Sequence, residues 1–217
     1  MNNLFLLVLY LFGLYSAFVA GSVLLRTPAF FPAANPRELH FPRTTLLLLL
    51  AVAVPSTLQF FFPAILAVFQ RDYERFLQGD WWRLITPLFV QDGGVSGTIF
   101  NLVSLLLVGS VVERLWGGRY MLIIFFIGGM VGELIAFVWQ PIGAGNSIGN
   151  FSLAASIAVI SLTHNPPRSA QIAALLTLCA DGVLVVLQDI HGASAIVGII
   201  LALVLYKRGY DRPQQLD

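Results

Sequence analysis

Seven apolar segments run through the 217-residue chain, and they limit its fold more than any other feature. Most of them approach the roughly 20 residues that a helix needs to cross a bilayer. Only 11% of the residues are charged, whereas soluble domains average about 25%. The sequence therefore predicts an all-α polytopic membrane bundle. The expected segments are Leu4–Leu25, Thr44–Phe69, Gly97–Trp116, Tyr120–Trp139, Ser147–Thr163, Ser169–Leu187 and His191–Tyr206.

The second segment contains Pro55 and Pro63, and we expect it to be one kinked helix, because neighbouring helices can satisfy the backbone groups that a proline frees. The first segment lacks the charged start and cleavage motif of a signal peptide, so we expect it to be retained. The longest connection, Gln70–Gly94, carries Trp81 and Trp82. We expect these two side chains at the level of the lipid headgroups.

Positive charges are divided unevenly between the two faces of the predicted bundle. Nine lysine or arginine residues follow segments one, three, five and seven, whereas three lie on the opposite face. The nine are Arg26, Arg37, Arg43, Arg114, Arg119, Arg168, Lys207, Arg208 and Arg212. The positive-inside rule then predicts that the N-terminus is outside and the C-terminus is cytoplasmic. We expect the protein to lie in a bacterial cell membrane.

Three polar side chains fall at a similar depth near the outer ends of three different predicted helices. Ser147 follows the glycine-rich turn GAGN, His191 opens the last segment, and Asn101 lies near the start of the third. A helical rise of about 1.5 Å per residue keeps each within the first turns. Histidine can take the proton of a serine hydroxyl. The Ser147 N–H and the Asn101 amide can stabilise an oxyanion.

The acidic residues are not expected to extend this pair into a triad. Asp189 lies two residues before His191, and we expect it to face the outer water. We expect Glu133 and Asp181, which lie within apolar segments, to form inter-helix hydrogen bonds. The residues therefore predict a Ser147–His191 dyad, and serine chemistry of this kind needs no metal or cofactor.

The motifs around these residues resemble those of the rhomboid intramembrane serine proteases, over roughly residues 44–206. The matching motifs are WWR at Trp81–Arg83, Asn101 at a helix start, VVERLWG at Val111–Gly117, GNS at Gly145–Ser147 and HGASAIVG at His191–Gly198. The resemblance implies a six-helix core at 44–206. Residues 1–43 would then add an N-terminal transmembrane helix and a cytoplasmic loop, and residues 207–217 would form a cytoplasmic tail.

The resemblance also implies a role for each matching residue. Ser147 would be the nucleophile and His191 the base, and Asn101 and the Ser147 N–H would hold the oxyanion. Five further residues would be structural: Trp82, Arg83, Glu113, Arg114 and Gly198. For Gly198 the sequence gives a reason of its own, because small residues at four-residue spacing allow helices to pack closely.

Two positions depart from the family pattern. Most rhomboids have a histidine one turn before the asparagine, where this chain has Gly97. The usual glycine after the nucleophile is Ile148. Gln91 or Thr98 could replace the missing donor. This matters because loss of one oxyanion donor typically slows catalysis by about 100- to 1,000-fold.

The sequence thus predicts a membrane serine protease that cleaves transmembrane helices of other proteins, with the lipid bilayer as its other partner. The alternative is a catalytically inactive relative that binds or escorts membrane clients, and Gly97 and Ile148 favour it. A third possibility, a solute transporter, rests on Asp181 and Glu133. The net charge of +1 argues against a nucleic-acid partner.

Overall fold

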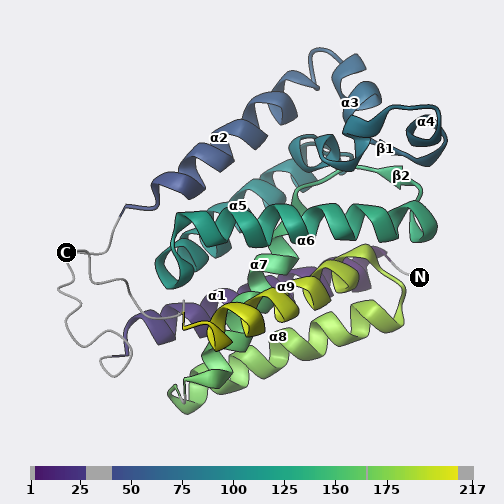
Figure 1. Cartoon of the computed structure of the whole chain (residues 1–217). Coiled ribbons are helices and arrows are strands. Elements are labelled where there is room, and N and C mark those ends of the chain that lie inside the picture. The colour runs from purple at the N-terminus through teal and green to yellow at the C-terminus, as the bar shows by residue number, and fades with distance from the viewer. Residues whose placement is uncertain (1–2, 28–40, 165, 210–217) are drawn as a thin grey trace.

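The computed structural model describes residues 3–27, 41–164 and 166–209. Its helices are α1 (Asn3–Leu25), α2 (Arg43–Leu58), α3 (Ala64–Phe69), α4 (Tyr73–Leu77), α5 (Gly94–Trp116), α6 (Gly118–Trp139), α7 (Ser147–Thr163), α8 (Arg168–Val186) and α9 (Ile190–Lys207) (Figure 1). The connections contain the 3-10 helices η2 (Trp81–Leu84) and η3 (Thr86–Phe89) and the strands β1 (Arg71–Asp72) and β2 (Ile142–Gly143).

Five helices, α1, α5, α6, α8 and α9, are long and apolar enough to cross a membrane, and α2 and α7 are shorter apolar helices. The protein is therefore an integral, multi-pass membrane protein, and the predicted all-α bundle is confirmed. Residues 28–40 of the expected cytoplasmic loop and 210–217 of the expected tail lie outside the described residues.

The predicted second segment is wrong, because it is two helices rather than one kinked helix. Helix α2 ends at Leu58, and α3 begins at Ala64. Pro63 is the N-cap of α3. It has no N–H to continue a helix that arrives from α2, but it is tolerated where a new helix begins. Pro55 remains inside α2. The other six segments agree with the structure to within three residues at each end.

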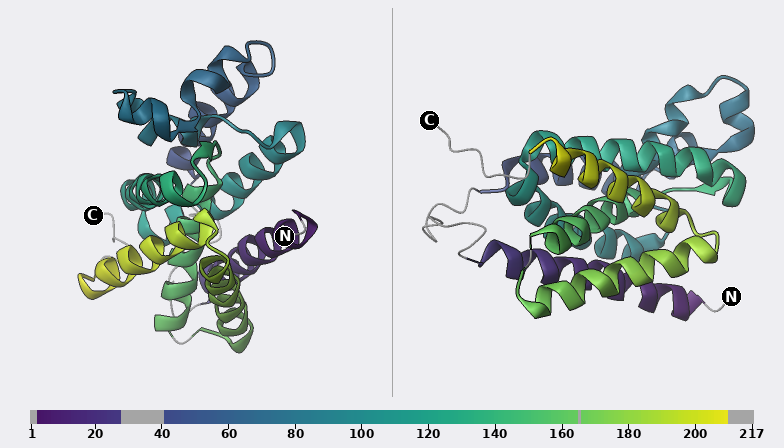
Figure 2. Two further views of the ribbon diagram at one scale, coloured as in Figure 1. Left: turned by 90° about the vertical axis from the view of Figure 1, so that its right-hand side faces the viewer. Right: turned by 60° about the horizontal axis from the view of Figure 1, so that its bottom comes forward.

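Helix α7 lies at the centre of the bundle. Every residue from Ile148 to Ser161 is buried, and α1, α5, α6, α8 and α9 all pack against α7. These five helices also contact one another in the order α5, α6, α9, α8, α1 and back to α5. Figure 2 shows α1 (purple) beside α8 (green) in this arrangement. Ser147 therefore opens a helix that is surrounded by five others.

Small residues bring α6 and α9 close to the α7 backbone. A Cβ placed on Gly198 of α9 would lie 2.8 Å from both Cα and C of Ser152. A Cβ on Gly128 of α6 would meet the side chain of the same serine. Glycine permits such approaches because it has no side chain to keep two helices apart. The close contact of α7 with α9 sets the distance between the helices that carry Ser147 and His191.

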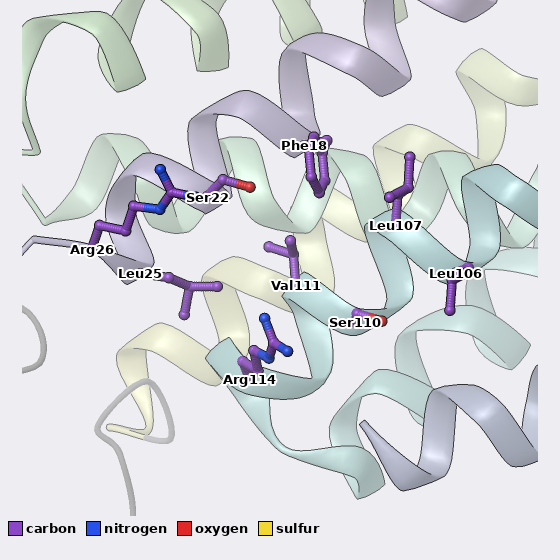
Figure 3. A pocket seen from close by; sticks show the side chains of 9 residues that line it. All are labelled: Phe18, Ser22, Leu25, Arg26, Leu106, Leu107, Ser110, Val111 and Arg114. Atoms are coloured by element: carbon purple, nitrogen blue, oxygen red, sulfur yellow. The ribbon is translucent and has the colours of Figure 1, made fainter. Parts of the chain in front are cut away.

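At the end of the bundle opposite Ser147, Glu113 joins α5 to the start of α2. Its carboxylate accepts the N–H groups of Thr44 and Thr45 at 2.9 and 2.7 Å, and the Thr45 hydroxyl at 2.7 Å. These N–H groups belong to the first turn of α2, where a helix cannot satisfy its own donors and a negative charge is favourable. Arg114 lines a cavity of about 310 Å³ between α1 and α5 together with Arg26 (Figure 3). This cavity is remote from Ser147.

Candidate active site

The structure brings Ser147 and His191 together. Ser147 is the first residue of α7 and His191 the second residue of α9. The His191 Nε2 and Ser147 Oγ atoms are 2.8 Å apart. His191 is only 8% exposed, and Ser147 is half-buried. A serine hydroxyl at this distance from an imidazole nitrogen can transfer its proton without any rearrangement of the two helices.

The expectation that Asp189 faces the outer water is wrong. Asp189 is 3% exposed, and its Oδ1 lies 2.6 Å from Nδ1 of His191. The same oxygen accepts the backbone N–H of His191 at 3.0 Å, because Asp189 is the N-cap of α9. An N-cap carboxylate reaches the N–H of the residue two or three positions later. Here that residue is a histidine, so Ser147, His191 and Asp189 form a chain of three groups rather than a pair.

Asp189 carries a negative charge at neutral pH. Burial acts to raise the pKa of its carboxyl, but the hydrogen bonds and charge of His191 and the hydrogen bond from Tyr10 outweigh burial and hold the pKa below its ordinary value. An ionised acceptor beside Nδ1 favours the imidazole tautomer with its proton on that nitrogen. Nε2 then faces Ser147 as an acceptor, which is the form that a general base requires.

The His191 imidazole packs against two aromatic rings, which also contact each other with their centroids 5.6 Å apart. The ring centroid of Phe151, from α7, lies 4.9 Å away, and that of Tyr10, from α1, lies 4.5 Å away. The Tyr10 hydroxyl also donates to Asp189 Oδ2 at 2.6 Å. Sequence reasoning missed Tyr10, because no motif indicates which residue of an extra helix reaches the site.

Asn101 is fixed by a network of buried amides. Its Nδ2 donates to Gln91 Oε1 at 2.7 Å, and Gln91 Nε2 donates to Asn146 Oδ1 at 2.7 Å. The Nδ2 groups of Asn146 and Asn150 donate to the backbone carbonyl oxygen of Asn101 at 3.3 and 3.0 Å. The network leaves the Asn101 amide with one defined orientation. It also passes through Asn146, which directly precedes Ser147.

Gly145 leaves a small space open between Ser147 and Asn101. A Cβ at this position would lie 3.2 Å from Ser147 Oγ, 3.4 Å from Asn101 Nδ2 and 3.5 Å from Gln91 Oε1. An oxyanion formed on a carbonyl bound to Ser147 would need space and donors at this place. The Ser147 N–H is a further donor, because the first N–H groups of a helix have no acceptor within it.

Neither residue expected to replace the family histidine acts as a free donor. The Thr98 hydroxyl donates to Gly94 O at 2.7 Å, within its own helix. Gln91 accepts from Asn101 through Oε1, and its Nε2 donates to Asn146 Oδ1 at 2.7 Å. A Cβ on Gly97 would meet nothing within 4 Å. The position that the histidine would take is therefore open.

The other departure, Ile148, is accommodated by α6. Ile148 is 2% exposed, and its side chain occupies the place that a Cβ on Gly132 would take. Its carbonyl oxygen accepts the Ser194 hydroxyl at 2.7 Å, which ties the start of α7 to α9. The larger side chain after the nucleophile therefore fits within the bundle.

The long connection between α3 and α5 holds the loop that precedes Ser147. Strand β1 pairs with β2, so that Arg71 lies opposite Gly143. The Gly145 N–H donates to Pro87 O at 2.9 Å, and the Ala144 N–H donates to Asp92 Oδ2 at 3.0 Å. Hydrogen bonds from both halves of the connection thus fix the turn from which α7 starts.

Glu133 was expected to form a hydrogen bond with another helix, but its partner is Arg71 of β1. Arg71 is 1% exposed and forms an ion pair with Glu133 at 2.5 Å, while its Nε donates to Gln140 O at 2.7 Å. Glu133 therefore binds the connection instead of a neighbouring helix. The same expectation is wrong for Asp181, whose two carboxyl oxygens are buried and have no hydrogen-bond partner among the described residues.

Arg83 and Trp82 fasten the connection to α3. Arg83 Nη1 donates to the carbonyl oxygens of Ala67 and Gln70 at 3.1 and 2.7 Å, and Trp82 Nε1 donates to Val68 O at 3.2 Å. Carbonyl groups at the end of a helix lack partners within it, and a cation is favourable there. No group of His, Cys, Asp and Glu side chains in the described part of the chain is arranged to hold a metal ion.

Comparison with known proteins places the chain in a family. The family model of the Rhomboid domain matches residues 78–208, which is more than half of the chain. The chain belongs to the rhomboid family. Asn101, Ser147, Asp189 and His191 all lie within the matched region, whereas Tyr10 and the rest of α1 lie outside it.

Three relatives illustrate the similarity. The chain is 34% identical to Rhomboid protease GluP of Bacillus subtilis over 88 residues, which cover 40% of this chain and 17% of the relative. It is 32% identical to Rhomboid protease AarA of Providencia stuartii over 75 residues, 35% of this chain and 26% of the relative. It is 29% identical to Rhomboid-like protease 3 of Toxoplasma gondii over 79 residues, 36% of this chain and 30% of the relative. The aligned stretches span less than a third of each relative.

The space beside Gly145 yields a prediction. We expect Gly145→Ala to slow labelling of Ser147 by a fluorophosphonate by about 100-fold or more, because a methyl group would occupy the place of the oxyanion. Gly79→Ala is the matched control, because Gly79 also has a positive φ (108°, against 157° at Gly145) and its Cβ would meet only Trp81 Nε1, at 3.8 Å. Labelling rates are compared at temperatures where both variants are folded. Equal rates would show that the oxyanion does not form in this space.

Proposed function

We propose that this rhomboid protein is an intramembrane serine protease. The observation that carries the proposal is the alignment of Asp189, His191 and Ser147 through contacts of 2.6 and 2.8 Å. Support also comes from the three relatives, two of which are named as rhomboid proteases and one as a rhomboid-like protease. Asp189 makes the reacting unit a triad rather than the dyad that the sequence predicts.

In the proposed reaction, Ser147 Oγ bonds to the carbonyl carbon of a peptide while its proton passes to His191 Nε2. The negative carbonyl oxygen lies beside Gly145, where the Asn101 amide and the Ser147 N–H stabilise it. His191 then gives the proton to the departing nitrogen, the C–N bond breaks, and an ester on Ser147 remains. A water molecule then attacks the ester and loses a proton to His191, the carboxyl product leaves, and the proton returns to Ser147.

The proposed substrate is a transmembrane segment of another protein. A site at the start of a membrane-embedded helix is reached most directly by a chain within the same bilayer. Arg26 directly follows α1, and Arg114 and Lys207 lie in the last turns of α5 and α9, at the end of the bundle opposite Ser147. The positive-inside rule therefore favours a position near the outer surface of the membrane for Ser147. We therefore propose that the N-terminus lies outside and the C-terminus in the cytoplasm. Because two of the three relatives are bacterial, we propose a bacterial cell membrane.

A second candidate function is a non-catalytic relative that binds membrane clients. Gly97 favours it, because no side chain takes the place of the family histidine at the oxyanion site. Ile148 no longer favours it, since Gly132 accommodates the isoleucine. The transporter loses half of its support, because Glu133 is paired with Arg71, and we do not propose it on the single buried Asp181.

Proteolysis separates the two candidates. The full chain is reconstituted in liposomes with a panel of single-span proteins that carry a different tag at each end. We expect wild type to release fragments cut near the outer end of the span, and Ser147→Ala to release none. Mass spectrometry of the fragments locates the cut. Capture of a client by folded wild type without cleavage of any member of the panel would favour the non-catalytic function.

The open space at Gly97 gives a second test. We expect Gly97→His to speed fluorophosphonate labelling of Ser147 by about tenfold or more, because the imidazole adds a donor to the oxyanion site. Gly97→Leu fills the same space without a donor and is the matched control. If both variants changed the rate equally, an added donor at this position would have no part in the reaction.

A further inference from the structure

Small residues fix helix α1 against the centre of the bundle. A Cβ on Gly13 would lie 3.3 Å from Ala180 Cβ of α8 and 3.6 Å from the Phe151 ring of α7. A Cβ on Gly21 would meet Val111 Cγ1 of α5 and would lie 2.8 Å from Ile157 Cγ2 of α7. Ala17, midway between these glycines, is fully buried. This four-residue spacing of small residues lets α1 pack closely against α5, α7 and α8, which sets the register of α1.

The register of α1 places Tyr10 against the proposed triad. Tyr10 precedes Gly13 by three residues, so it lies on the same face of the helix. Its hydroxyl donates to Asp189 Oδ2 at 2.6 Å, and its ring centroid lies 4.5 Å from that of His191. A residue of the N-terminal helix thus contacts two of the three groups, although α1 lies outside the residues that the family model matches.

We propose that Tyr10 is a positioning residue, so that α1 is a working part of the active site. This inference rests on the proposed function and deepens it. Tyr10 acts through Asp189 and His191 and does not touch the reacting atoms. Its two contacts, through the hydroxyl and through the ring, have separate physical effects.

The hydroxyl holds the Asp189 carboxylate in place. Oδ1 accepts from the side chain and the backbone of His191, and Oδ2 accepts from Tyr10. The terminal torsion of an aspartate side chain is soft, so one oxygen alone does not fix the carboxylate plane. Without the Tyr10 hydroxyl, the charged and buried Oδ2 would lose its hydrogen-bond donor. The bond between Oδ1 and Nδ1 would then be less well oriented.

The ring limits the rotation of the imidazole. His191 has the Phe151 ring as one neighbour and the Tyr10 ring as another. These contacts keep Nε2 directed at Ser147. Phenylalanine at position 10 would retain the ring and remove only the hydroxyl, whereas leucine would remove both. Two variants can therefore measure the two contributions separately.

The test compares rates of Ser147 labelling by a fluorophosphonate in full-length variants. We expect Tyr10→Phe to slow labelling by about tenfold, the effect of losing one hydrogen bond to a charged group. We expect Tyr10→Leu to slow it further. Tyr15→Phe is the matched control, because Tyr15 lies on the same helix and is 67% exposed. Thermal unfolding confirms that each variant is folded, and Tyr10→Phe keeps the shape of the native side chain.

A double variant distinguishes positioning from a general structural effect. In an Asp189→Asn background the carboxylate that Tyr10 orients is absent, so we expect added Tyr10→Phe to change the rate by less than about twofold. An equal loss in both backgrounds, or a Tyr10→Phe rate equal to that of Tyr15→Phe, would overturn the inference. If folded wild type is not labelled at all, the proposed function fails instead, and the two failures are thus distinguished.

Discussion

The hydrogen bond between Ser147 and His191 is the constraint on which the rest of this structure depends. It joins residues 44 positions apart in the chain, so α7 and α9 must begin at the same depth and lie close together. Gly198 permits the approach, because it places α9 directly on the Ser152 backbone. The Ser194 hydroxyl then bonds the first turn of α7 across the interface. Small and hydroxylated residues of α9 thus position the histidine.

A polar site inside a membrane bundle is stable only when its polar groups are paired. Leaving a buried donor or acceptor without a partner costs about 1–3 kcal/mol, and more for a charge. Asp189 receives three donors, and Asn101 belongs to a closed amide network. The connection between α3 and α5 adds Arg71, whose guanidinium is paired with the carboxylate of Glu133. Arg71 also lies opposite Gly143 in the loop that leads to Ser147. The connection between α3 and α5 is therefore part of the structure that supports the site.

Much of this could be predicted from the sequence, because hydropathy and helical rise are local properties. They located six of the seven segments and put Ser147, His191 and Asn101 at one depth. The break before Pro63 was missed, since apolar composition continues across it. Asp189 could have been identified by its position, because an aspartate just before a helix is a common N-cap. Tyr10 could not be identified in this way, and Gln91 was named only as a replacement donor, since the contacts of both depend on how distant segments pack.

The central claim is that Asp189 completes a triad, and the most direct test is the rate at which a fluorophosphonate labels Ser147 in folded Asp189→Asn. Asparagine preserves the size of the side chain, but it removes the charge that favours the working tautomer of His191. A triad predicts a rate at least about 100-fold below that of wild type, with the label still confined to Ser147. A rate equal to that of wild type would contradict the triad and leave a Ser147–His191 dyad.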